Sequence, residues 1–83
     1  MHQATALVYD TAEFGARIRT LRVEKGLRQD ELADRIGVTR MTISRLERGE
    51  SVSVDTAFRA LSECGYAVAV LPKFTRVAVL DGS

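Results

Sequence analysis

Apolar residues recur at helical spacing along the first two thirds of the chain. Phe14, Ile18 and Leu21 lie four and three positions apart, which predicts a helix over residues 12–25 with Thr11 as its N-terminal cap. Three more helices are predicted over residues 29–36, 40–48 and 54–63, bounded by glycines and capping hydroxyl side chains. The apolar residues expected on their inner faces are Leu32, Ala33, Ile36, Val38, Ile43, Leu46, Val54, Ala57, Phe58, Leu61 and Cys64.

The pattern changes after Gly65. Residues 66–71 read YAVAVL, carry no charge and are apolar at every position, which predicts a strand with two apolar faces. Such a strand must be covered on both faces and paired along its edges. Residues 74–80 are a second candidate strand, and residues 4–9 are weakly strand-like. We interpret residues 1–83 as one mainly α domain, with a helical core at 11–64 and a strand region at 66–80.

Composition places the chain among globular proteins. It has 83 residues, 46% of them hydrophobic and 28% charged. No apolar run approaches the roughly 20 residues of a membrane-spanning helix, and the first ten residues do not resemble a secretion signal. His2 is the single histidine and Cys64 the single cysteine, so neither a metal cluster nor a nucleophile–base pair is expected. We therefore expect a cytoplasmic protein that is not an enzyme and needs no metal or cofactor.

Charge is unevenly distributed along the chain. The formal net charge is only +1, but residues 17–48 hold nine basic and five acidic residues, a balance of +4. The other residues together carry −3. This asymmetry indicates one basic face, either a surface for a polyanion or simply a solvated side of a helical domain.

Two short helices joined by a glycine-containing turn, at 29–36 and 40–48, match the helix-turn-helix motif. The stretch LRVEKGLRQDELADRIGVTRMTISRLERGE, residues 21–50, resembles the Xre/Cro-type helix-turn-helix family, which has a lambda-repressor-like four-helix fold. One departure is Arg28, where the family usually has a Thr or Ser cap. Against the solvated-face alternative, this resemblance favours DNA binding.

The resemblance implies specific roles for the polar residues of the motif. In the family, the start of the third helix enters the DNA major groove, where arginine can donate to both O6 and N7 of guanine. The residues expected to contact bases are Arg40, Met41, Ser44 and Arg45. The residues expected to contact phosphates are Arg28, Gln29, Thr39, Thr42 and Arg48. Arg22 and Glu47 are expected to form a structural ion pair, the alternative being two unrelated exposed charges.

The strand after the last helix is similar to that of HipB-like antitoxins, in which it pairs with the same strand of a second subunit. The residues expected to dimerise are Tyr66, Val68, Val70 and Leu71, although a hairpin within one chain, 66–71 against 74–80, stays possible. The resemblance implies a homodimeric repressor that binds a palindromic operator and a HipA-like kinase toxin and autoregulates a HipBA-type operon. The alternatives are a stand-alone Xre-type regulator and a protein-interaction adaptor that does not bind DNA.

Overall fold

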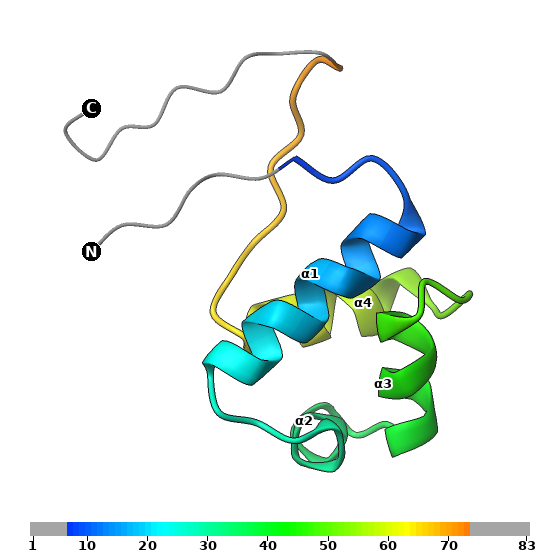
Figure 1. The fold of residues 1–83 in the computed structure, drawn as a ribbon, viewed down its shortest axis with the longest axis vertical. Coiled ribbons are helices and arrows are strands. Elements are labelled where there is room, and N and C mark those ends of the chain that lie inside the picture. The colour runs from blue at the N-terminus through cyan, green and yellow to red at the C-terminus, as the bar shows by residue number, and fades with distance from the viewer. Residues whose placement is uncertain (1–6, 74–83) are drawn as a thin grey trace, which may run out of the picture.

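The computed structural model describes residues 7–73, and all regular secondary structure within that range is helical. The helices are α1 (Thr11–Glu24), α2 (Gln29–Ile36), α3 (Arg40–Glu47) and α4 (Val54–Glu63) (Figure 1). All four predicted helices are confirmed, with ends that differ by one residue at most. Across the described residues, none of these helices has the length and apolar character required to cross a membrane.

N-cap side chains cap α1, α3 and α4 at their N-termini. For α1, Asp10 rather than Thr11 is the cap: its carboxylate accepts a hydrogen bond of 2.8 Å from the Glu13 N–H, and Thr11 is already helical. The prediction was wrong by one residue, because Asp and Thr are both favoured caps and stand side by side here. Thr39 and Ser53 cap α3 and α4 as predicted.

The helices enclose a small apolar core in which Ile18, Leu32 and Ile43 are completely buried. α1 and α2 both pack against α3, and α2 also packs against α4. Gly15 permits the contact between α1 and the end of α3, since a Cβ at this position would lie 2.3 Å from the Leu46 carbonyl oxygen. The whole core comprises Ile18, Leu21, Leu27, Leu32, Ala33, Ile36, Ile43, Leu46, Ala60, Leu61 and Cys64.

Helix α4 is rotated relative to the prediction. Val54 and Phe58 were expected in the core, but they are 72% and 54% exposed. Thr56 and Ala60 are buried instead. Burial of Thr56 is tolerated because its hydroxyl accepts a hydrogen bond of 2.9 Å from Ser53, which satisfies the polar group at the start of the helix.

After α4, the chain leaves the helical body and runs back past the N-terminal segment (Figure 1). Residues 66–71 do not form the expected strand in the described part of this single chain. The physical reason is that a strand is defined by hydrogen bonds to a neighbouring strand, and residues 7–73 contain no such neighbour. The second candidate strand, 74–80, lies outside the described residues, as do residues 4–6 of the candidate segment 4–9, and residues 7–9 are not helical or extended in a sheet.

Candidate nucleic-acid interface

The turn between α2 and α3 fixes the geometry of the motif. Gly37 has a φ of 73°, the left-handed conformation that ends α2, and the Val38 N–H donates to the Ala33 carbonyl. Thr39 then starts α3: its hydroxyl accepts a hydrogen bond of 3.2 Å from the Thr42 N–H. Only three residues, 37–39, separate the two helices. The turn therefore leaves little freedom in the angle between α2 and α3.

The polar residues of α3 gather on its outer face. Residues 40, 41, 44 and 45 are spaced by three and four positions, so they share one side of a helix. Arg40, Met41 and Arg45 are exposed, Met41 to 62%, and Ser44 is half-buried at the edge of the same face. The opposite face carries Ile43, which is inside the core. The four residues predicted to contact bases thus form one outward-facing surface.

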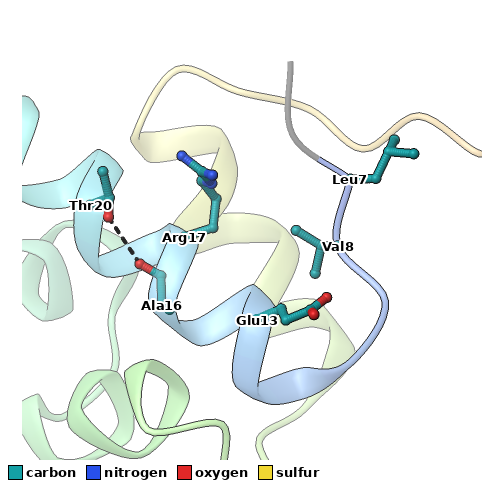
Figure 2. A pocket seen from close by; sticks show the side chains of 6 residues that line it. All are labelled: Leu7, Val8, Glu13, Ala16, Arg17 and Thr20. Carbon is teal, nitrogen blue, oxygen red and sulfur yellow. Dashed lines mark hydrogen bonds between the residues drawn. The ribbon is translucent and has the colours of Figure 1, made fainter. Parts of the chain in front are cut away.

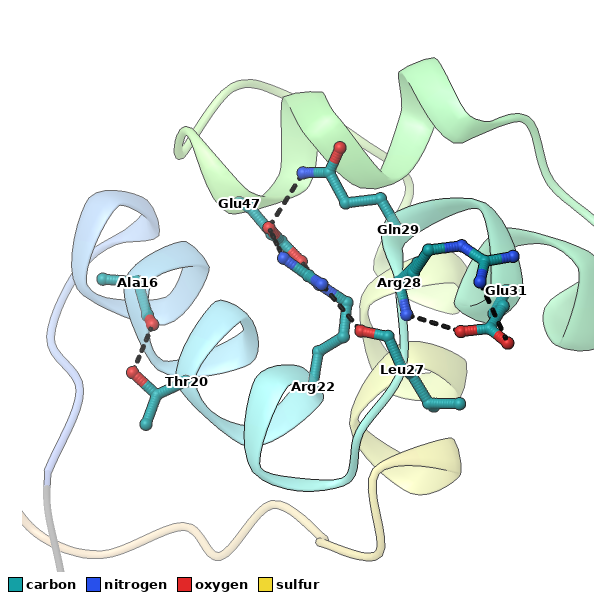
Figure 3. A network of polar contacts seen from close by, with 8 residues as sticks. All are labelled: Ala16, Thr20, Arg22, Leu27, Arg28, Gln29, Glu31 and Glu47. Carbon is teal, nitrogen blue, oxygen red and sulfur yellow. Dashed lines mark hydrogen bonds and ion pairs between the residues drawn. The ribbon is translucent and has the colours of Figure 1, made fainter.

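A buried polar network holds this surface in place (Figure 3). The Arg22 side chain of α1 donates two hydrogen bonds to the Glu47 carboxylate, with Nε 2.5 Å from Oε2 and Nη2 3.0 Å from Oε1. A third hydrogen bond, 2.8 Å long, goes from Arg22 Nη1 to the Leu27 carbonyl. Both charged side chains are at most 10% exposed. The structure therefore places the predicted pair in direct contact and excludes two unrelated exposed charges.

The network also explains an acidic residue at an unfavourable position. Glu47 ends α3, where the helix dipole disfavours a negative charge. The Arg22 guanidinium compensates this charge, and Gln29 at the start of α2 adds a hydrogen bond of 3.0 Å from Nε2 to Glu47 Oε1. Three helices thus meet at one carboxylate. Gln29 keeps a second amide N–H that this bond does not use, so its expected phosphate contact is compatible with the network.

Arg28 lies at the N-terminal end of α2, on the exposed surface. Its backbone N–H donates to Glu31 Oε1 at 2.8 Å, which is the half of a capping box that the third helical residue supplies, while no side chain at position 28 caps the first helical N–H groups as a Thr or Ser would. Its guanidinium lies 3.0 Å from Asp30. The hydrogen bond from Arg28 lowers the pKa of the Asp30 carboxyl, and the charge of Arg28 adds to this effect. One predicted phosphate contact is thus already paired with acidic neighbours.

Arginines at the C-terminal end of α3 are also paired with an acidic residue. Arg48 Nε lies 2.7 Å from Glu50 Oε2, and Arg45 Nε lies 3.7 Å from Glu50 Oε1. Arg48 also donates a hydrogen bond to the Ser44 hydroxyl. Arg40, by contrast, has no ion pair with any described residue. The sequence analysis did not identify Glu50 as a partner of these arginines, although its position two residues after Arg48 makes such an ion pair possible.

The residues predicted to dimerise lie on a different surface. Tyr66, Val68, Val70 and Leu71 are all at least 40% exposed, and Val70 is 93% exposed. Tyr66, Val68 and Leu71 line a groove of about 550 Å³, which we call the terminal groove. Its apolar lining comprises Leu7, Val8, Tyr9, Phe14, Leu21, Leu61, Tyr66, Ala67, Val68, Ala69, Leu71 and Pro72.

Figure 2 shows how the N-terminal segment borders this region. Leu7 and Val8 lie alongside α1, from which Glu13, Ala16, Arg17 and Thr20 also line a smaller hollow. Large exposed apolar side chains of both terminal segments, Leu7, Val8, Tyr9, Tyr66, Val68 and Leu71, therefore line one groove, which contains no residue of α3.

The potential metal ligands and the cysteine of the described residues do not form a further site. No group of three or more potential metal ligands exists within residues 7–73. Cys64 is 5% exposed, and burial raises the pKa of its thiol. It is thus a core side chain, as expected.

A short helix, a glycine turn and a second helix with an outward polar face define a helix-turn-helix domain. The chain belongs to the helix-turn-helix family, of the Xre type, because the sequence model of that family matches residues 18–71. The resemblance described above is therefore confirmed.

Two relatives are similar to part of the chain. An HTH-type transcriptional regulatory protein of Pyrococcus furiosus is 46% identical over 46 residues, which are 54% of this chain and 15% of that protein. An HTH-type transcriptional regulator of Methanothermobacter thermautotrophicus is 62% identical over 32 residues, or 39% of this chain and 46% of that protein. The chain spans less than half the length of either relative.

The fold is similar to that of HipB. The complex of a HipB variant with the O2 20mer superposes with a TM-score of 0.78 at 22% identity, covering 84% of this chain and 99% of HipB. The HipA–HipB–O2–O3 complex gives a TM-score of 0.76 at 23% identity, covering 83% and 99%. At these identities the likeness establishes a HipB-like fold.

Proposed function

We propose that this protein is a transcriptional repressor that reads DNA sequence with the outer face of α3. The observation that carries the proposal is the combination of an outward surface at Arg40, Met41, Ser44 and Arg45 with a buried network at Glu47 that fixes the orientation of α3. A surface that reads base edges must be both accessible and rigidly held. Membership of a family whose relatives are named transcriptional regulators supports the same function.

The contacts divide into two kinds. Arg40 and Arg45 read base edges, with Met41 against a thymine methyl group and Ser44 beside them. Arg28, Gln29, Thr39, Thr42 and Arg48 surround this set and contact phosphates, which fixes the register on the duplex.

The test is DNA binding by the full chain. A duplex is first selected from a random library, and its affinity is then measured across a salt series by fluorescence anisotropy. Binding should weaken steeply with salt, as phosphate contacts require. Arg40→Ala should cost about 1–3 kcal/mol on the selected duplex. Arg35→Ala, a change to an arginine of α2 that is paired with Glu63, is the matched control and should cost much less. If the chain bound no duplex, the adaptor alternative would be favoured.

We further propose that the repressor is a homodimer that binds a palindrome. Two recognition helices related by a twofold axis must lie about 34 Å apart to enter successive major grooves. In this proposal residues 66–71 pair with the same segment of a second subunit, which would cover the exposed Val68, Val70 and Leu71. The exposed apolar surface beside the terminal groove supports this, as does the HipB-like fold.

Sedimentation of the full chain tests the dimer. Val70→Lys should shift the equilibrium to monomer, because it would introduce a charge into the proposed strand pair. Val54→Lys is the control, since Val54 is also largely exposed but lies on α4. A dimer that survives Val70→Lys would favour the hairpin within one chain.

The most specific part of the proposal is that the repressor binds a toxin. A structure with the same fold contains HipA together with HipB, and this supports a role as the cytoplasmic antitoxin of a HipBA-type operon that binds a kinase-like toxin. The discriminating experiment is co-purification with the product of the adjacent reading frame. If that product is not kinase-like, or does not co-purify, the stand-alone Xre-type regulator is the better assignment.

A further inference from the structure

Glu50 is held at a fixed position beside the proposed DNA surface. Gly49 has a φ of 79° and turns the chain back, and the Glu50 N–H donates to the Arg45 carbonyl at 2.9 Å. A Cβ at position 49 would lie 2.7 Å from Ala12 Cα, so the turn is packed against α1. The backbone therefore presents the Glu50 carboxylate next to the C-terminal end of α3.

The carboxylate of Glu50 is shared by two arginines that the proposed function assigns to DNA. Arg48 Nε is 2.7 Å from Oε2, and Arg45 Nε is 3.7 Å from Oε1. The hydrogen bond from Arg48 lowers the pKa of the Glu50 carboxyl, and the charges of both arginines add to this. The carboxylate is thus charged whenever the protein meets DNA near neutral pH. The Glu50 side chain is also 48% exposed, so its carboxylate lies on the surface that a DNA phosphate would approach.

We propose that Glu50 is a specificity-determining residue, whose carboxylate competes with DNA phosphates for Arg45 and Arg48. This inference rests on the proposed function. Non-specific DNA offers mainly phosphates, and binding to it is essentially electrostatic. Both arginines would have to leave Glu50 to contribute to that binding. On a specific site, the base edge takes the terminal Nη groups of Arg45, so its Nε can stay beside Glu50 and only Arg48 has to leave the carboxylate to bind a phosphate.

Glu50 therefore weakens non-specific binding more than specific binding. Arg40, which has no ion pair among the described residues, supplies base contact without any such competition. The acidic residue lowers total affinity but raises the ratio of specific to non-specific affinity, which is the quantity that decides occupancy of an operator in a genome.

The test is Glu50→Gln in the full chain, with affinities measured for the selected duplex and for a duplex of shuffled sequence. Affinity for the shuffled duplex should rise roughly tenfold and its salt slope should steepen by about one to two phosphate contacts. Affinity for the selected duplex should rise roughly threefold or less, so that the ratio between the two falls. The matched control is Glu63→Gln, the same change at a carboxylate of α4 that is paired with Arg35 of α2, and it should leave the ratio unchanged.

Each other outcome has a defined meaning. An equal rise for both duplexes, no rise, or a loss of affinity would overturn the role of Glu50 while leaving the proposed function intact. If the wild-type chain bound no duplex, both the proposed function and the role of Glu50 would fail. Thermal melting of both variants verifies the fold, which a change at a half-exposed position should preserve.

Discussion

Replacement of Arg22 with methionine should destabilise the protein more than any surface substitution. The change removes three hydrogen bonds, two to Glu47 and one to the Leu27 carbonyl. It leaves the Glu47 carboxylate, whose side chain is 3% exposed, with Gln29 as its remaining hydrogen-bond partner. An uncompensated charge in that position also opposes the dipole of α3.

The magnitude follows from the burial of the pair. Removing one partner of a buried ion pair costs about 3–5 kcal/mol. A chain of this length has a total stability of about 4–12 kcal/mol, at roughly 0.05–0.15 kcal/mol per residue. The variant should therefore lose a large share of its stability, and its melting temperature should fall by at least about 12 °C. The double variant Arg22→Met with Glu47→Leu should recover most of this loss, because no buried charge is left without a partner.

Urea denaturation followed by circular dichroism measures these free energies of unfolding. Glu63→Gln serves as the comparison, because the Arg35–Glu63 pair is exposed and its loss should cost less than about 1 kcal/mol. A cost for Arg22→Met no greater than that for Glu63→Gln would contradict a stabilising role of the buried pair. Simple additivity of the costs of Arg22→Met and Glu47→Leu would contradict it as well.

Three further predictions concern the scaffold. Gly15→Ala should lower the free energy of unfolding, measured in thermal melts, by about 1–3 kcal/mol, because the alanine Cβ would collide with the Leu46 carbonyl. This cost should outweigh the better helix propensity of alanine, and a stabilised variant would contradict the close contact. Thr39→Ala should cost about 1 kcal/mol in urea melts by removing the cap of α3, and an unchanged midpoint would exclude that role. At pH 8, iodoacetamide should alkylate Cys64 far more slowly in the folded protein than in the urea-unfolded protein. Burial raises the pKa of the thiol, so less of the reactive thiolate is present in the folded protein. Equal alkylation rates would show that the thiol is accessible.

Most of the fold could be predicted because local signals agree with one another. Glycines at the helix ends, capping side chains and apolar spacing all place the helices at the same residues. The error at α4 arose where two apolar stripes share one helix. Val54 and Phe58 form one stripe, but the polar Thr56 lies on the buried one, and Ser53 makes that burial possible.

The candidate site was only partly predictable from the sequence. The residues of α3 expected to face DNA were assigned from the family resemblance. The contact of Gln29 with Glu47 joins residues that are distant in the chain, so no spacing rule could indicate it. The position of Glu50 depends on the left-handed turn at Gly49, which brings its carboxylate back to Arg45 and Arg48. Residues 66–71 need a partner strand, and periodicity does not specify which segment supplies it.

The most direct test of the central claim is to map where DNA contacts the protein. Backbone amide chemical shifts of the isotope-labelled full chain can be followed by NMR while the selected duplex is added. The largest changes should fall at residues 28–30 and 39–48, which form the start of α2 and the whole of α3. Changes concentrated instead at 54–58 or beside the terminal groove, with α3 unaffected, would contradict the assignment of α3 as the recognition helix.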